Sequence, residues 1–262
     1  MNDIFNFRRF RLYFIKTILE RPAQILGTFA LSFSVVILIY FLLKSIGNFE
    51  VAQLLSFTIG LVGGGCLLAS LVFGYFSDMA GGASYLTLPV STFEKWLCGT
   101  LLVGLYLGCF LFFFRGLDSF FVHLYHNSLN RQDARYKEQY DAVYIFTFFG
   151  ESLEVFVFFL NAAASMLVGS LYFNKVSFIK VALVMCAIYF FTFLLNYGIS
   201  SILFKDIVRS FPFHNVSIQN GNEMGVLVMP SIWNQLYDVI ALYILPTILL
   251  GVSFIRLKEK EF

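Results

Sequence analysis

Six long and predominantly apolar runs determine what this chain can fold into. They cover residues 25–46, 52–76, 96–114, 155–173, 178–204 and 236–255. As a helix, each run is long enough to cross the roughly 30 Å hydrocarbon core of a bilayer, which takes about 20 residues. The chain is 59% hydrophobic and 13% charged, whereas soluble domains carry about 25% charged residues. We therefore predict an all-α integral membrane protein, a single domain over residues 1–262 with six transmembrane helices.

The segment before the first run, residues 1–22, predicts an amphipathic helix that lies on the membrane surface. Four apolar side chains recur at helical spacing, namely Phe7, Phe10, Phe14 and Ile18. Three charged side chains share the opposite side, namely Arg9, Lys16 and Glu20. Because basic amphipathic helices bind anionic lipid at the interface, we expect membrane lipid to be a partner of this helix. The alternative is a short disordered arm.

The distribution of basic residues predicts the orientation. An even number of spans places both termini on one side of the membrane. Lys and Arg are more frequent on that side, and the bias is strongest in residues 8–21 and 256–260. Since cytoplasmic loops carry an excess of Lys and Arg, we predict that both termini are cytoplasmic. Residues 77–95 then form a cytoplasmic segment and residues 205–234 an extracytoplasmic loop, whose apolar patch at 224–230 suggests partial re-entry.

The segment between the second and third runs has the residues of an ordered loop. It holds Asp78, Glu94 and Lys95, and a charge costs about 2.5–3.5 kcal/mol at the centre of a membrane helix, so the segment must reach water. Ser91 and Glu94 have the spacing of a capping box, and Pro89 keeps the residue before it extended. A helix should therefore start at Ser91. Nearby apolar side chains are available for a partner to cover: Tyr85, Leu86, Leu88, Phe93 and Trp96.

Glycine, charge and cysteine patterns exclude several functions. The glycines at 63–65 lack the Gly-Lys-Ser/Thr ending of a phosphate-binding P-loop. Gly60 and Gly64 form a GxxxG motif, which allows another helix to approach closely, so we expect them to serve helix packing. A net charge of +2 without a basic, aromatic-rich patch argues against a nucleic-acid partner. The cysteines show no CxxC spacing and are expected to be packing residues.

Polar side chains follow one side of the fifth run at spacings of three or four residues: Tyr189, Thr192, Asn196 and Ser200. Asn161 and Ser165 form a shorter line on the fourth run. Polar groups at membrane depth face protein or a wet cavity rather than lipid. Two interpretations stay open. These residues make hydrogen bonds between helices, or they line a substrate path formed by Asn161, Ser165, Thr192, Asn196 and Ser200.

Two pairs of metal-ligating side chains also have a three-residue spacing, His123 with His126 and Glu151 with Glu154. Imidazole and carboxylate groups bind several metals, but a long charged loop separates the two pairs. Interfacial side chains that face water are the alternative, and we predict no metal site.

The string at residues 84–102, SYLTLPVSTFEKWLCGTLL, resembles the cytoplasmic segment between the second and third spans of ABC-2 type permeases. These permeases are the membrane subunits of ATP-driven exporters. The resemblance is carried by a Leu-x-Leu-Pro-Val-Ser segment followed by Glu-Lys: Leu86, Leu88, Pro89, Val90, Ser91, Glu94 and Lys95. The layout agrees over nearly the whole chain, and its Phe-rich, small form is similar to permeases of the Bacteroidetes group.

The resemblance implies a permease of the bacterial cytoplasmic (inner) membrane that exports a substrate by alternating access. Such a permease is not itself an enzyme and binds no cofactor. ATP and Mg belong to a separate ATPase subunit, which receives a coupling helix formed here by Tyr85, Leu86, Leu88, Pro89, Ser91, Glu94 and Lys95. These permeases work as dimers, with a homodimer expected here. Its seam would be formed by Gly60 and Gly64 or by the first and fifth spans.

Two other functional classes remain as alternatives. One is an intramembrane enzyme that uses the His and Glu pairs at the outer face for acid–base chemistry. The other is a membrane scaffold or immunity protein that binds a partner through the segment at 77–95 and transports nothing.

Overall fold

The computed structural model describes residues 5–46, 49–77, 88–133, 135–146, 153–173, 177–203, 207–211, 215–220, 223–228 and 230–260. Six of its helices are long and apolar enough to cross a membrane, as predicted. They are Pro22–Ser45, Phe49–Val72, Thr92–Ser128, Val155–Tyr172, Ser177–Leu203 and Gln235–Glu259. The chain is therefore a multi-pass membrane protein.

The first half of the chain forms the helices α1, Phe7–Glu20; α2, Pro22–Ser45; α3, Phe49–Thr58; α4, Gly65–Val72; and α6, Thr92–Ser128. Between α3 and α4 the second span continues through a π-helical segment, η1 (Ile59–Gly64), and a 3₁₀ turn, η2 (Gly74–Ser77), follows α4. The second half adds α7, Tyr136–Asp141; α8, Leu153–Tyr172; α9, Ser177–Leu203; α10, Ser231–Val239; and α11, Leu245–Glu259. A second π-helical segment, η3 (Ile240–Ile244), joins α10 to α11.

A small antiparallel sheet lies between α9 and α10 and was not predicted. Its strands, in the order β1-β2-β3, are Ile207–Phe211, Asn215–Asn220 and Glu223–Val228. In the β2–β3 pair, Val216 lies opposite Leu227 and Ser217 opposite Val226. An open sheet leaves unpaired backbone groups at both edges, which is unfavourable in lipid. The apolar patch at 224–230, for which partial re-entry was suggested, lies mostly in strand β3 of this sheet.

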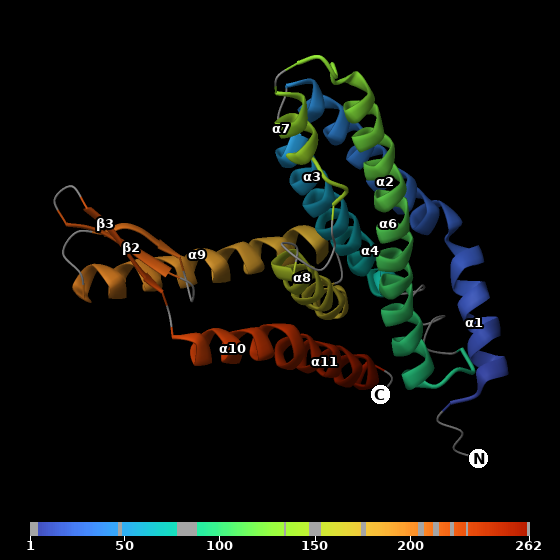
Figure 1. Ribbon diagram of the computed structural model, residues 1–262. Coiled ribbons are helices and arrows are strands. Elements are labelled where there is room, and N and C mark those ends of the chain that lie inside the picture. The colour runs from blue at the N-terminus through green and yellow to red at the C-terminus, as the bar shows by residue number, and fades with distance from the viewer. Residues whose placement is uncertain are drawn as a thin grey trace.

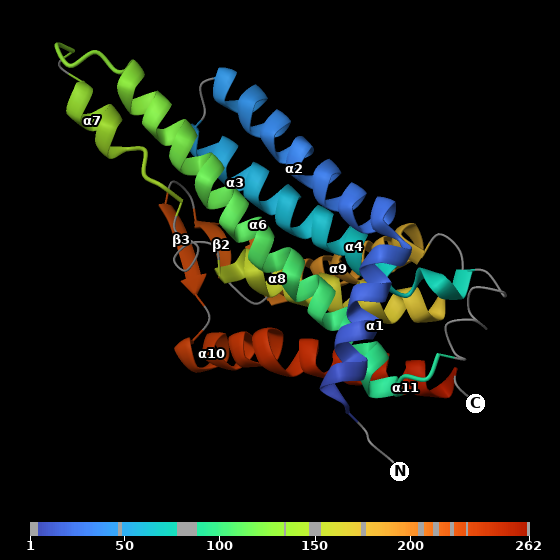
Figure 2. The ribbon, with the colours of Figure 1, turned by 90° about the vertical axis from the view of Figure 1, so that its right-hand side faces the viewer.

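The helices form two groups (Figures 1 and 2). One contains α1, α2, α3–α4 and α6, and the other contains α8, α9 and α10–α11. The groups meet near the two termini, where α4 packs against α8 and α6 against α11, and they spread apart toward α7 and the sheet. Both termini lie at the same end of the molecule, as an even number of spans requires.

Aromatic side chains fill the centre of the first group. Phe110 and Phe114 of α6 are fully buried and meet Phe57 of α3 at centroid distances of 5.9 and 5.1 Å. Nearby, Tyr40 of α2 stacks on Phe121 at 4.5 Å. Such contacts add to the stabilisation from area burial. The third span is thus the packing centre of this group, whereas α9 turns nearly all of its apolar surface outward.

The third span is longer than predicted, because α6 continues past residue 114 to Ser128. The third apolar run ends at residue 114, before Arg115 and Asp118, yet both residues lie within the helix. Asp118 is fully buried and accepts hydrogen bonds from Tyr40 Oη at 2.7 Å, Gln53 Nε2 at 2.8 Å and Phe146 N at 2.6 Å. A charged carboxylate is tolerated inside a structure when hydrogen bonds compensate its burial, so Asp118 does not end the helix.

Candidate functional site at the base of α6

The capping box predicted at the start of the third span is confirmed. Ser91 is the N-cap of α6, and its Oγ accepts a hydrogen bond from Glu94 N at 3.2 Å. In return, Ser91 N donates to Glu94 Oε2 at 3.1 Å. The pair satisfies two of the backbone N–H groups that a helix start leaves without partners. The helix therefore has a defined beginning, one residue after Ser91.

Glu94 also binds α1, which the sequence does not predict. Arg9 donates from Nε to Glu94 Oε2 at 2.7 Å and from Nη2 to Oε1 at 2.9 Å, a bidentate ion pair. Asn6 N donates to Oε1 at 2.7 Å. Asn6 is the N-cap of α1, and its own side chain accepts from Arg8 N and Arg9 N. One carboxylate therefore joins the beginnings of two helices.

The side chains expected to meet a partner are partly covered by the chain itself. Glu94 is fully buried and Lys95 is 1% exposed. Trp96 Nε1 donates to Ser253 Oγ of α11 at 2.9 Å, and its ring lies 5.9 Å from that of Phe254. The base of α6 is thus joined to α1 through Glu94 and to α11 through Trp96. We call this set of contacts, made by Asn6, Arg9, Ser91, Glu94, Trp96 and Ser253, the α6 base junction.

Only part of the predicted coupling segment can be described. Pro89 is exposed, and Leu88 is half-buried against the core. Tyr85 and Leu86 fall at residues 78–87, outside the described residues. The described residues of the segment at 77–95 are Ser77 at the end of η2, the bends at 88–90, the cap Ser91 and the first turn of α6. Pro89 is therefore the predicted coupling residue that the described structure presents at the surface.

The helix α1 forms over the predicted residues, but its apolar side chains are divided between two surroundings. Phe10 is buried, and Phe14 and Ile18 pack against the core, so these members of the predicted lipid-facing stripe face protein instead. Phe7 is exposed. Other apolar side chains of α1 and the residues before it are exposed as well: Phe5, Leu12, Ile15 and Leu19. Periodicity alone cannot distinguish these two apolar faces, because both have helical spacing.

Gly60 and Gly64 provide close helix contacts within the chain. A β-carbon at Gly60 would overlap the side chains of Val36 and Phe110, and one at Gly64 would overlap those of Tyr106 and Ser32. These glycines face α2 and α6 of the same chain, so the seam considered for them between two permease chains is wrong. Tyr106 Oη donates to Gly60 O at 2.6 Å and lies 2.6 Å from Ser32 Oγ.

The residues predicted to line a substrate path have different surroundings in the described structure. Asn161 is buried and donates from Nδ2 to Ala241 O in η3 at 2.8 Å, a hydrogen bond between helices. On α9, Thr192 Oγ1 donates to Ile188 O of its own helix at 2.8 Å, while Ser200 is buried. Ser165 and Asn196 are half-buried. For Asn161, the interpretation as an interhelical hydrogen bond is the one the contacts support.

The His residues have separate surroundings. His126 Nε2 lies 3.1 Å from Val143 O, and its ring stacks on Tyr140 at a centroid distance of 3.8 Å. His123 is exposed. Glu151 and the side chain of Glu154 lie outside the described residues. Among the described residues, no three metal-ligating side chains gather into a site.

Several residues of the α6 base junction have no signature in the sequence. Arg9 and Glu94 are 85 positions apart, and Trp96 and Ser253 are 157 apart. Hydrophobic periodicity carries no information about such pairs. Chemically, the arrangement is a set of hydrogen bonds and one ion pair that connects the start of α6 to two other helices.

A search of protein-family models, of curated proteins and of solved structures finds no match to this chain.

Proposed function

We propose that this chain is the permease subunit of an ATP-driven exporter of the ABC-2 type. In this proposal it lies in the bacterial cytoplasmic membrane with both termini cytoplasmic, and a separate ATPase supplies the energy. The observation that carries the proposal is the α6 base junction, which lies directly after the Leu-Pro-Val-Ser string that resembles the coupling segment of such permeases. A segment pushed by a motor protein needs rigid connections to the helices that it must move.

The α6 base junction offers those connections. A displacement of Pro89 would reach Ser91 over two residues and then the helix that Ser91 caps. The bidentate pair with Arg9 would carry the displacement to α1, and the hydrogen bond from Trp96 to Ser253 would carry it to α11. Since α11 belongs to the second helix group and α6 to the first, the displacement would change how the two groups sit against each other. Packed elements of this kind move as rigid bodies.

The working unit proposed is a homodimer. Gly60 and Gly64 contact α2 and α6 of the same chain. We therefore place the dimer seam at the first and fifth spans. Both spans expose most of their apolar surface. In the apolar stretch of each span, only 17% of the residues of α2 and 6% of those of α9 are buried. In this arrangement, lipid covers whatever part of these faces the second chain does not.

Purification from native membranes tests the proposal. A tagged chain solubilised in mild detergent should retain an ATPase with a Walker A motif, and ATP hydrolysis by the complex should rise on reconstitution into lipid. Pro89→Leu should insert normally but return hydrolysis toward the rate of the ATPase alone. The matched control is Phe112→Leu, at an 85% exposed position on α6. Purification of the chain without any ATPase, from membranes that express both, would contradict the proposal.

A further inference from the structure

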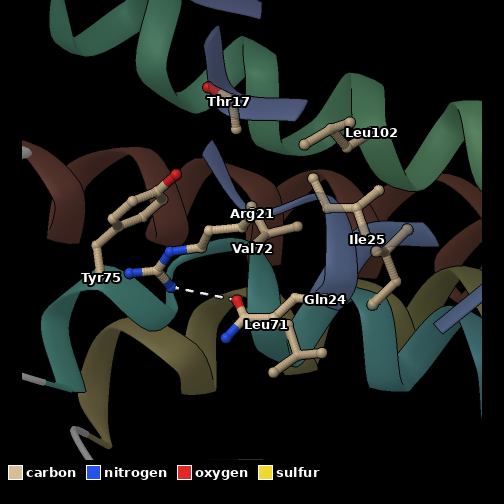
Figure 3. Close-up of a pocket in the computed structure, with 9 residues that line it drawn as sticks. Thr17, Arg21, Gln24, Ile25, Leu71, Val72, Tyr75 and Leu102 are labelled. Carbon is tan, nitrogen blue, oxygen red and sulfur yellow. Dashed lines mark hydrogen bonds between the residues drawn. The ribbon is translucent and has the colours of Figure 1, made fainter. Parts of the chain in front are cut away.

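A groove beside the junction of α1 and α2 is not used by the proposed transport mechanism. About 330 Å³ of empty space lies in and in front of it. Its polar side chains are Thr17, Arg21, Gln24 and Tyr75 (Figure 3). The rest of the lining is aliphatic and comes from α2, α4 and α6, including Ile25 and Leu71. The groove therefore has a polar part and an apolar part.

Arg21 dominates the polar part. Its guanidinium carbon lies 3.7 Å from the centre of the Tyr75 ring, and Nη1 donates to Gln24 Oε1 across a long 3.4 Å (Figure 3). A guanidinium has five N–H donors in a fixed plane. Within the described part of the chain, the Arg21 side chain makes no ion pair and only this one hydrogen bond, while its backbone carbonyl accepts from Gln24 N and Ile25 N. The ring holds the guanidinium in place while its other donors remain available to an anion.

The polar and apolar parts of the groove lie at the depths of the headgroup and the acyl chains of a lipid molecule. Arg21 directly precedes Pro22, where the first span begins, and Tyr75 follows Val72, where the second span ends. The polar side chains are therefore at the level of lipid headgroups, where Tyr and Arg are common anchors. Ile25 and Leu71 belong to the spans themselves and lie at the depth of acyl chains. No carboxylate is among the described lining residues, although Glu20, the residue before Arg21, interacts electrostatically with Tyr75.

We propose that this groove binds an anionic phospholipid, with its phosphate on Arg21 and the first part of an acyl chain against Leu71 and Ile25. Planar guanidinium groups bind phosphate through paired hydrogen bonds. The apolar wall distinguishes a lipid from free phosphate, which would gain nothing from it. The inference is independent of the ATPase, since it concerns lipid held at the α1–α2 junction whether or not the chain transports anything.

Lipid binding to the purified full-length chain tests the inference. Native mass spectrometry in detergent would measure binding of phosphatidylglycerol, of phosphatidylcholine and of inorganic phosphate. We expect phosphatidylglycerol to bind in preference to the other two. Arg21→Ala should weaken its binding about tenfold, while Arg11→Ala, which removes the same charge from an exposed position on α1, should change it less than about twofold. A tenfold change corresponds to about 1.4 kcal/mol.

Two further variants test the contact with the lipid headgroup and the contact with the acyl chain separately. Leu71→Trp fills the apolar part without changing any charge and should also weaken phosphatidylglycerol binding. Arg21→Lys keeps the charge but loses the planar fork, and it should bind between the wild type and Arg21→Ala. Equal losses in Arg21→Ala and Arg11→Ala would overturn the site in favour of general attraction to a basic helix. Unchanged binding in Leu71→Trp would overturn the role of the acyl chain, and preferred binding of inorganic phosphate would overturn the lipid as ligand.

Discussion

Glu94 shows how a single side chain can organise the start of a membrane helix. Its carboxylate accepts hydrogen bonds from Ser91 N within α6 and from Asn6 N and Arg9 of the α1 region. Charge-assisted, bidentate hydrogen bonds are among the strongest in proteins. Because Glu94 is fully buried, its bonds to Arg9 and Asn6 help to fix the position of α1, together with the packing of Phe10 in the core.

Glu94→Gln should therefore destabilise the protein. The amide keeps the size of the side chain but loses the charge and one acceptor oxygen. Lost hydrogen bonds to a charged group cost about 1.5–3 kcal/mol, and Arg9 is 35% exposed, which favours the lower end. Thermal unfolding of the purified protein in detergent measures the change. The control is Glu259→Gln, whose ion pair with Arg256 is 54% exposed on the Glu side and should contribute less than about 1 kcal/mol. Equal melting temperatures for the two variants would contradict this role of Glu94.

The capping box could be predicted because its two residues are three positions apart and each side chain accepts from the backbone N–H of the other residue. The ion pair to Arg9 could not, because its partners are distant in the sequence and Arg9 belongs to a run of several basic residues. Glu94 and Lys95 were expected at a partner surface for a related reason. Charges near a membrane interface suggest contact with water, whereas here the chain itself encloses both side chains.

At the scale of elements, the contact between α2, η1 and α6 depends on the absence of side chains at two glycines. Gly64→Ala should lower the melting temperature, since the added methyl group would overlap Tyr106 and Ser32. Overpacking of this kind costs about 1–3 kcal/mol. Gly63→Ala is the control in the same π-helical segment, because nothing lies within 4 Å of a β-carbon there. A Gly64→Ala protein as stable as Gly63→Ala would show that the three helices do not meet at this point.

Asp118 holds the C-terminal half of α6. Its two oxygens accept from Tyr40, Gln53 and the backbone of Phe146, so it ties α2, α3 and the segment after α7 to one position. Asp118→Asn replaces one acceptor by a donor and leaves at least one buried donor unpaired, at about 1–3 kcal/mol. Thermal unfolding should detect this loss, with the exposed Asp141→Asn as the control. A loss in the control as large as that in Asp118→Asn would contradict the role of the buried carboxylate.

Hydropathy predicted all six spans because a stretch of about 20 apolar residues has few other stable environments. The extension of α6 to Ser128 escaped prediction, since Arg115 and Asp118 look like loop residues until Tyr40 and Gln53 are placed beside them. The sheet at 207–228 escaped for another reason. Its strands are paired by backbone hydrogen bonds, which leave only a weak pattern in a loop rich in Asn, Gly and Ser.

At the scale of the whole molecule, the two helix groups touch near the termini and separate toward α7 and the sheet. The α6 base junction lies in the region of contact, where α6 meets α11 and α1 crosses the base of α6 (Figure 2). A force applied there would act close to the pivot between the groups. At this location, a movement of the start of α6 would change the angle between the two helix groups, as the proposed permease requires.

Site-specific crosslinking tests this account most directly. A photoreactive amino acid at Pro89, the exposed position just before the helix cap, should form an adduct in intact cells with an ATPase that carries a Walker A motif. The same amino acid at Phe112, on the exposed apolar side of α6, should form none. An adduct with the ATPase at Pro89 alone is the predicted result. Absence of that adduct from cells that express both proteins, or reaction of position 89 with a reagent confined to the cell exterior, would contradict it.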